Sequence, residues 1–269
     1  MNTITYAAPA TLSELLGLLV RRGDEVTLIA GGMSLMPLLN RGIGQRNHLV
    51  TLGRVAGLAG VTTDGDDLVI GATTTHTDLA ADTVVRERHP MLSRAAAGIG
   101  DLQVRNRGTV GGALAYANPG ADELTALAAL GATVVLTSTH GERHIGVADF
   151  LLSAHRTARR PDEVLSAVRV PPPSGPAGFA RLGRVQGAPP TITAAAVVEG
   201  TAICLAVGGV ATRPLLLTTS RDALDDDVRR AAAAAAQPIT GDPMNPPEYR
   251  RAMACVLARR AVRTAIDGS

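Results

Sequence analysis

The sequence VTLIAGGMS at residues 26–34 is the most informative stretch of the chain, because it predicts a buried apolar strand that runs directly into two adjacent glycines. A second glycine pair closes the sequence RNRGTVGG at residues 105–112. Glycine allows positive φ and lets the backbone approach a ligand closely, and unpaired backbone amides in such a bend form a cradle for an anion. Two such bends in one domain predict a pyrophosphate held from both sides, with Ser34 and Thr109 adding hydroxyl donors. Ordinary tight turns remain the alternative, and neither bend matches the dinucleotide-fold G-x-G-x-x-G or the P-loop pattern.

Composition narrows the class of protein. The chain has 269 residues, 46% of them hydrophobic and 19% charged, which is typical of a globular protein. A net charge of +2 and an aromatic content of 2% argue against nucleic-acid binding. The basic stretch at residues 155–160 is expected to be an exposed loop that can meet a partner subunit.

Cysteine usage and hydropathy give further limits. The two cysteines, Cys204 and Cys255, form no C-x-x-C pair, so the sequence favours neither an iron–sulfur cluster nor a structural zinc site within this chain. Both are expected to be buried, inert thiols. Residues 1–9 lack the basic start and apolar run of a secretory signal, and no run of 18 apolar residues occurs. We therefore expect no membrane span and a reducing, cytoplasmic location.

Local patterns predict an α+β fold. Thr11 followed by Glu14 is typical of a helix start, and Thr75 begins another helix. The proline-rich sequence PPPSGP at residues 171–176 predicts a linker between an N-terminal domain at 1–170 and a smaller C-terminal domain at 177–269. Further strands are predicted at 48–52, 67–70, 133–137, 192–198 and 202–207, and further helices at 91–99, 124–130, 222–236 and 247–266.

The two glycine bends, taken together and in this order, resemble a known family. Beyond the sequences AGGMSLMP at 30–37 and RNRGTVGG at 105–112, the resemblance continues through NPGAD at 118–122, IGATTTH at 70–76 and GGVATRP at 208–214. The family is that of the FAD-binding medium subunits of the xanthine dehydrogenase and carbon monoxide dehydrogenase group, the molybdenum hydroxylases. The resemblance covers nearly the whole chain. It implies an FAD-binding domain of the vanillyl-alcohol-oxidase type, in which two α+β subdomains clasp an extended FAD. A smaller α+β C-terminal domain of the carbon monoxide dehydrogenase flavoprotein type would follow.

The resemblance also implies a set of cofactor-binding residues. Asp122 is expected to bind the ribose or ribityl hydroxyls, and Leu165 the adenine end. Arg181 stands where the family usually has Lys near the flavin ring, and a cation there would stabilise a reduced, anionic flavin. No catalytic residue and no metal ligand is assigned. The remaining contacts are expected from backbone on both sides of the diphosphate and at the adenosine or flavin edge, at Ile29, Ala30, Gly31, Gly32, Met33, Ser34, Leu35, Ile99, Gly100, Gly108, Thr109, Gly111 and Gly112.

Several residues depart from the family pattern. Met33 replaces a Gln or His, Ala113 an Asn or Ser, and Asn118 an Asp, while an Asp expected after Arg184 is absent. Each change removes a side-chain hydrogen bond of about 0.5–1.5 kcal/mol. The backbone cradle survives all of them.

Other residues stay open between a structural and a functional role. Asp122 can also cap the helix at 124–130. His76 is expected to be a loop or cap residue rather than a catalytic base. Arg105 and Arg107 are either solvated surface or partners of the diphosphate, and Tyr116 is expected to fill core rather than stack on the flavin.

Three functions follow from these expectations. The leading one is an electron-transfer subunit that takes electrons from [2Fe–2S] clusters of a small partner subunit, in a complex whose large subunit holds the molybdenum cofactor, and passes them to an external acceptor. The second is a stand-alone FAD-dependent oxidase, dehydrogenase or cyclase on the same scaffold. The third is a subunit that has lost FAD and serves only in assembly.

Overall fold

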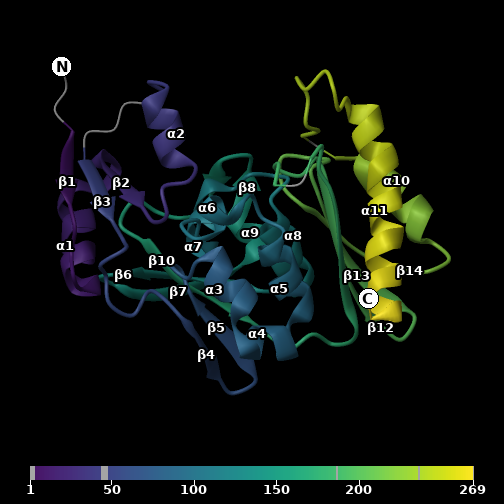
Figure 1. Cartoon of the computed structure of the whole chain (residues 1–269), viewed down its shortest axis with the longest axis horizontal. Coiled ribbons are helices and arrows are strands. Elements are labelled where there is room, and N and C mark those ends of the chain that lie inside the picture. The colour runs from purple at the N-terminus through teal and green to yellow at the C-terminus, as the bar shows by residue number, and fades with distance from the viewer. Residues whose placement is uncertain (1–3, 44–47, 186, 236, 269) are drawn as a thin grey trace.

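The computed structural model describes residues 4–43, 48–185, 187–235 and 237–268. Within them the chain forms an α+β fold in which the three larger of four sheets follow one another across the molecule (Figure 1). The first is parallel, with strand order β1 (Thr5–Ala7), β3 (His48–Thr51) and β2 (Val26–Ile29). The predicted fold class is confirmed.

The first sheet is covered by α1 (Leu12–Arg22), whose start follows the predicted signal. The Thr11 hydroxyl accepts a hydrogen bond from the amide of Glu14, and the Glu14 carboxylate accepts one from the amide of Ala10. The turn η1 (Gly23–Glu25) leads from α1 into β2, which ends at the first glycine pair. The helix α2 (Leu35–Asn40) begins after Met33 and Ser34, which follow that pair.

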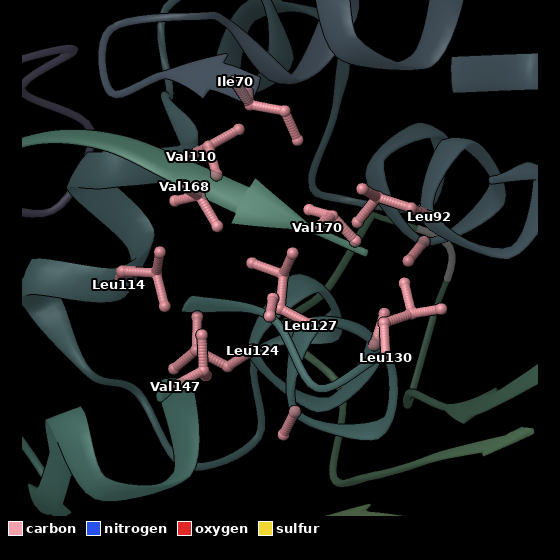
Figure 2. Packing of buried hydrophobic residues seen from close by; sticks show 14 of the residues in the cluster. Ile70, Leu92, Val110, Leu114, Leu124, Leu127, Leu130, Val147, Val168 and Val170 are labelled. Carbon is pink, nitrogen blue, oxygen red and sulfur yellow. The ribbon is translucent and has the colours of Figure 1, made fainter. Parts of the chain in front are cut away.

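The second sheet is antiparallel and forms the centre of the molecule. Its strand order is β4 (Val61–Asp64), β5 (Asp67–Gly71), β10 (Val164–Val170), β6 (Thr133–Ser138) and β7 (Gly141–Gly146). Figure 2 shows its side chains Val168 and Val170 packed with Val110, Leu114 and Leu127 of two neighbouring helices. The short elements around it are α3 (His76–Ala81), α4 (Thr83–Arg88), α5 (Pro90–Ala97), α6 (Leu102–Arg105), α7 (Val110–Tyr116), α8 (Asp122–Ala129), α9 (Val147–Phe150), β8 (Leu151–Ser153) and β9 (Arg156–Thr157).

The third sheet is an antiparallel meander of β11 (Ala177–Leu182), β12 (Ile192–Glu199), β13 (Ala202–Gly208) and β14 (Leu215–Ser220). The helices α10 (Leu224–Ala233) and α11 (Pro247–Asp267) cover its outer face (Figure 1). A Cβ atom on Gly178 would lie 2.2 Å from the carbonyl oxygen of Ala261, so this glycine allows α11 to approach the sheet closely. The inner face turns toward α8, and its side chains Phe179, Ala195, Val197 and Ala206 join the central core.

Most predicted elements are confirmed to within a few residues, with two corrections. Gly111 and Gly112 do not form a free bend but lie in the first turn of α7. The predicted helix 222–236 is shorter, since α10 ends at Ala233, and residue 236 lies outside the described residues. No helix among the described residues is long and apolar enough to cross a membrane.

Candidate functional site

The two glycine segments, residues 30–37 and 105–112, are in direct contact. A Cβ atom on Gly31 would lie 1.8 Å from the carbonyl oxygen of Arg107 and 3.0 Å from the Cα of Gly108. Gly32, at φ 75°, turns the chain from β2 into α2. Only a residue without a side chain at position 31 permits this contact, so the sequence fixes the two segments side by side.

The first segment offers unpaired donors. The backbone amides of Gly32, Met33, Ser34 and Leu35 have no hydrogen-bond acceptor among the described residues, although the amide of Met36 bonds to the carbonyl of Gly32. Ser34 precedes α2 but its hydroxyl does not cap that helix. These donors match the predicted anion cradle.

The second segment works differently from the prediction. The amide of Gly111 donates to the carbonyl of Ala72 at 2.9 Å, and the amide of Gly112 donates to the Thr109 hydroxyl at 3.1 Å. These two glycines therefore supply space rather than free donors: a Cβ atom on Gly111 would lie 2.6 Å from that of Ala72. The Thr109 hydroxyl accepts from Gly112 and keeps its own hydrogen available for a ligand.

Both segments line one cleft of about 760 Å³. Its lining contains the predicted residues Ile29, Ala30, Gly31, Gly32, Met33, Ser34, Leu35, Ile99, Gly100, Gly108, Thr109, Gly111, Gly112, Asp122 and Leu165. Arg181 is the exception, because it does not belong to the lining residues. A cleft of this size, lined by unpaired backbone donors together with apolar and charged side chains, is suited to a large phosphate-containing cofactor.

Arg181 instead forms an ion pair with Asp122. Its Nε lies 2.8 Å from the Asp122 carboxylate, and its Nη2 donates to the carbonyl of Ala188 at 3.0 Å. Burial raises the pKa of Asp122 to about 6, even though the Arg181 guanidinium acts to lower it. Asp122 does not cap a helix, since it is the first residue of α8 and Ala121 occupies the cap position.

The next residue, Glu123, forms a second buried pair that the sequence did not reveal. Its Oε1 lies 2.8 Å from Nδ1 of His76, and the two side chains are 0% and 5% exposed. Burial acts to lower the pKa of His76, but the Glu123 carboxylate outweighs it and the pKa lies above the ordinary value. His76 is not a cap residue, because the Thr75 hydroxyl caps α3. A second carboxylate directly after Asp122, at the start of the mostly apolar sequence DELTALAAL at 122–130, was the available signal.

The structure also shows the positions of Arg105, Arg107 and Tyr116, whose roles the sequence left open. Arg105 is not free surface, since its guanidinium donates to the carbonyls of Ile99 and Gly100 and so shapes that part of the cleft. Arg107 is exposed. Tyr116 does not fill core but lines the cleft half-buried, with its ring 4.5 Å from that of His155.

Within the basic stretch 155–160, Arg159 departs from the exposed loop that was predicted. It is half-buried, lines the cleft, and donates to the carbonyls of Arg160 and Glu163. Burial lowers its pKa, against the pull of Glu163 and Asp24. The signal in the sequence was weak, because one of several neighbouring arginines cannot be told from the others by pattern.

Metal and thiol chemistry find little support in the part of the chain that the structure describes. No group of three or more His, Cys, Asp or Glu side chains there could hold a metal ion. Cys204 is half-buried and Cys255 buried, both are free, and burial raises the pKa of each thiol.

Comparison with known proteins identifies close relatives of this architecture. Residues 2–173 match the family model described as the FAD binding domain in molybdopterin dehydrogenase. The carbon monoxide dehydrogenase medium chain of Afipia carboxidovorans is 34% identical over 279 aligned positions, covering 98% of this chain and 97% of that protein.

Solved structures give the same result over the full length. A chain of the crystal structure of the Cu,Mo-CO dehydrogenase superposes with a TM-score of 0.90 at 32% identity, covering 99% of this chain and 98% of that one. A chain of quinoline 2-oxidoreductase from Pseudomonas putida 86 superposes with a TM-score of 0.88 at 29% identity, with 99% and 98% covered.

Proposed function

This chain belongs to the FAD-binding medium-subunit family of the xanthine and carbon monoxide dehydrogenases, and from that premise we propose how it holds FAD and what it does in a complex. It is accordingly an FAD-binding oxidoreductase subunit. We propose that the cleft between the two glycine segments is where FAD binds, with the diphosphate at the point where Gly31 contacts Arg107.

The proposed position of the diphosphate rests on the hydrogen-bond donors of the cleft. The residues Gly32, Met33 and Ser34, whose amides are unpaired, line the same cleft as Thr109, which supports a site where donors from two distant segments would bind one anion. The residues present therefore fit a nucleotide diphosphate through backbone geometry. The loss of side-chain donors at Met33 and Ala113 leaves that geometry intact.

Residues along the cleft support placements for the rest of the cofactor. We propose that Leu165 and the half-buried Arg159 contact the adenine end, and that Asp122 accepts a hydrogen bond from a ribose or ribityl hydroxyl. Ile99 and Gly100, braced by Arg105, would border the ring systems. We propose that Arg181 acts on the flavin through Asp122, because it pairs with that carboxylate and is not among the lining residues.

Bound FAD would supply redox chemistry that takes up electrons one at a time or in pairs, so it can be reduced by one-electron carriers in two steps. We propose that the subunit receives electrons from [2Fe–2S] clusters of a small subunit, in a complex with a molybdenum-containing large subunit, and delivers them to an external acceptor. Support comes from relatives named as medium chains, which align with this chain from end to end. The free thiols of Cys204 and Cys255 agree with a reducing, cytoplasmic setting.

The division of the chain into two domains is also a proposal. We assign residues 1–170 to the FAD-binding domain and 177–269 to a C-terminal domain. The second of these has a hydrophobic core of its own between the third sheet and the helices α10 and α11. The assignment places the cleft almost entirely within the first domain, with Gly187, Pro189 and Pro190 contributed by the second.

Purification of the chain, alone and with its native partners, tests the proposal. We expect the visible absorption bands of oxidised flavin, release of FAD and not FMN on denaturation, and co-purification with cluster-bearing and molybdenum-bearing subunits. Substrate turnover by the isolated chain without any partner would instead favour a stand-alone flavoenzyme. A colourless chain that binds no added FAD would overturn the proposed site.

A further inference from the structure

The segment Gly108–Gly112 rests on the residues that lead into α3. The amide of His76 donates to the carbonyl of Gly108 at 3.0 Å, and the amide of Val110 donates to the carbonyl of Thr74 at 3.1 Å. The His76 ring fills the space beneath Gly108, where a Cβ atom would lie 2.7 Å from both Cδ2 and Nε2 of the imidazole. The ring and the segment are therefore in direct contact, with no other side chain between them.

Glu123 holds the His76 ring at its Nδ1 atom. The Nδ1–Oε1 distance is 2.8 Å, and Oε2 of the same carboxylate is buried with no hydrogen-bond partner among the described residues. A buried carboxylate with a single polar partner depends on that partner for compensation of its charge. His76 is thus fixed between the carboxylate on α8 and the glycine segment that lines the cleft.

We propose that the His76–Glu123 pair is a positioning element of the FAD site, which holds a proton beneath the diphosphate segment so that loss of this proton weakens FAD binding. The inference rests on the diphosphate placement proposed above. His76 and Glu123 are themselves among the lining residues of the cleft, and the pair acts through Gly108 and through the charge of the His76 ring rather than by a hydrogen bond to the cofactor.

The charged groups around His76 set the direction of the effect. Glu123 and Asp122 on α8 favour the imidazolium, whereas burial and Arg105 on α6 oppose it, and the pKa of His76 ends above 6.5. Asp78, on the same helix as His76, accepts a hydrogen bond from the Thr75 hydroxyl. A doubly charged diphosphate binds the cationic form more tightly, so by linkage FAD affinity falls as pH rises through this pKa.

The test measures the FAD dissociation constant of the full-length chain between about pH 7 and about pH 9, a range above the pKa of about 6 of Asp122, by quenching of flavin fluorescence. For the wild type we expect the dissociation constant to rise on the order of tenfold across this range. His76→Gln, which cannot titrate, should give a flat profile. Glu123→Gln removes the carboxylate that holds the proton, so the rise should begin at lower pH.

Thr125→Val is the matched control. Thr125 lies two residues beyond Glu123 on α8, is buried, and its hydroxyl lies 2.7 Å from that of Thr193, away from the cleft lining. This variant also loses a buried hydrogen bond, but it should keep the wild-type profile. A Thr125→Val profile as flat as that of His76→Gln would mean that general loosening of α8 explains the effect, and would overturn the proposal.

A measurement on the wild type keeps the proposal testable if a variant fails to fold. NMR titration of the His76 ring should show its pKa rising when FAD is added. A His76 pKa that is the same with and without FAD, or a wild-type slope in His76→Gln, would contradict the positioning role while leaving the FAD site itself in place. Failure of the wild type to bind FAD at any pH would instead remove the proposed site.

Discussion

Gly31 makes the closest backbone contact between the two segments of the cleft. Because any side chain there would lie 1.8 Å from the Arg107 carbonyl oxygen, Gly31→Ala must push the segments apart. We expect FAD affinity to fall by roughly 100-fold or more, as measured by titration of the apoprotein with FAD.

Gly146→Ala is the control for this substitution. Gly146 has φ −57° and its nearest neighbour to an added Cβ is a side-chain oxygen at 3.8 Å, so alanine fits. Wild-type affinity in Gly31→Ala would show that the two segments need not touch for FAD to bind.

Asp122 gives a prediction on pH. Its pKa in the folded chain is about 6 against an ordinary 3.8, so between these values the folded state retains a proton that the unfolded state has released. Stability of the apoprotein therefore falls as pH rises from about 4 to about 6, by about 2–3 kcal/mol from this group. Denaturant unfolding at several pH values should show a smaller decline in Asp122→Asn.

The quantity to compare between wild type and Asp122→Asn is the change of unfolding free energy with pH, not its value at one pH. The substitution also leaves Arg181 without its charged partner, which lowers stability at every pH. Asp66→Asn serves as the control, since the Asp66 side chain is 90% exposed and should leave the slope unchanged. An unaltered slope in Asp122→Asn would mean that the folded chain does not hold this proton.

At the scale of elements, the predicted helices and strands arose from local signals. The Thr11 and Thr75 caps and the apolar runs at β2 and β12 are short-range features, and the structure has them where the sequence placed them. The helix start at Gly111 and Gly112 was not predicted, because two adjacent glycines disfavour a helix. The local Thr109 cap and the hydrogen bond from Gly111 to the distant Ala72 hold it there.

Contacts in the site that join distant residues could not be predicted from the sequence, whereas contacts within a glycine segment could. Backbone contacts of a glycine segment follow from its own sequence and from the family resemblance. The pairs His76–Glu123 and Arg181–Asp122 join residues 47 and 59 positions apart. No local pattern specifies which buried carboxylate meets which cation, so these pairs emerge only from the packed structure.

The cap of α7 gives a prediction at this scale. Thr109 and Thr11 cap α7 and α1 in the same way, by accepting a hydrogen bond from the amide three residues later. Replacing either by alanine should cost about 1 kcal/mol of unfolding free energy. Only Thr109→Ala should also weaken FAD binding, because only the Thr109 hydroxyl lines the cleft. Equal FAD affinities in the two variants would exclude Thr109 as a ligand.

At the scale of the whole molecule, the third sheet shares its inner face with the central core. This shared core predicts that the apoprotein unfolds in one cooperative transition rather than two. The buried Arg250 of α11 ties the C-terminal part together, and its guanidinium donates to the carbonyls of Thr191, Gly209 and Asn245 and to the Asp242 carboxylate.

Arg250→Leu should therefore lower the midpoint of the whole transition, with a loss of about 3–5 kcal/mol, as followed by circular dichroism and by intrinsic tyrosine fluorescence together. Arg263→Leu, which changes an exposed arginine on the same helix, should leave the midpoint nearly unchanged. Separate transitions by the two probes would show that the C-terminal part folds independently.

We propose that amides of one segment and a hydroxyl of the other hold the diphosphate of FAD between them. A crystal structure of the chain with bound FAD tests this most directly. We predict diphosphate oxygens within hydrogen-bonding distance of the amides of Gly32, Met33 and Ser34 and of the Thr109 hydroxyl. A diphosphate bound away from the contact between Gly31 and Arg107 would contradict the account.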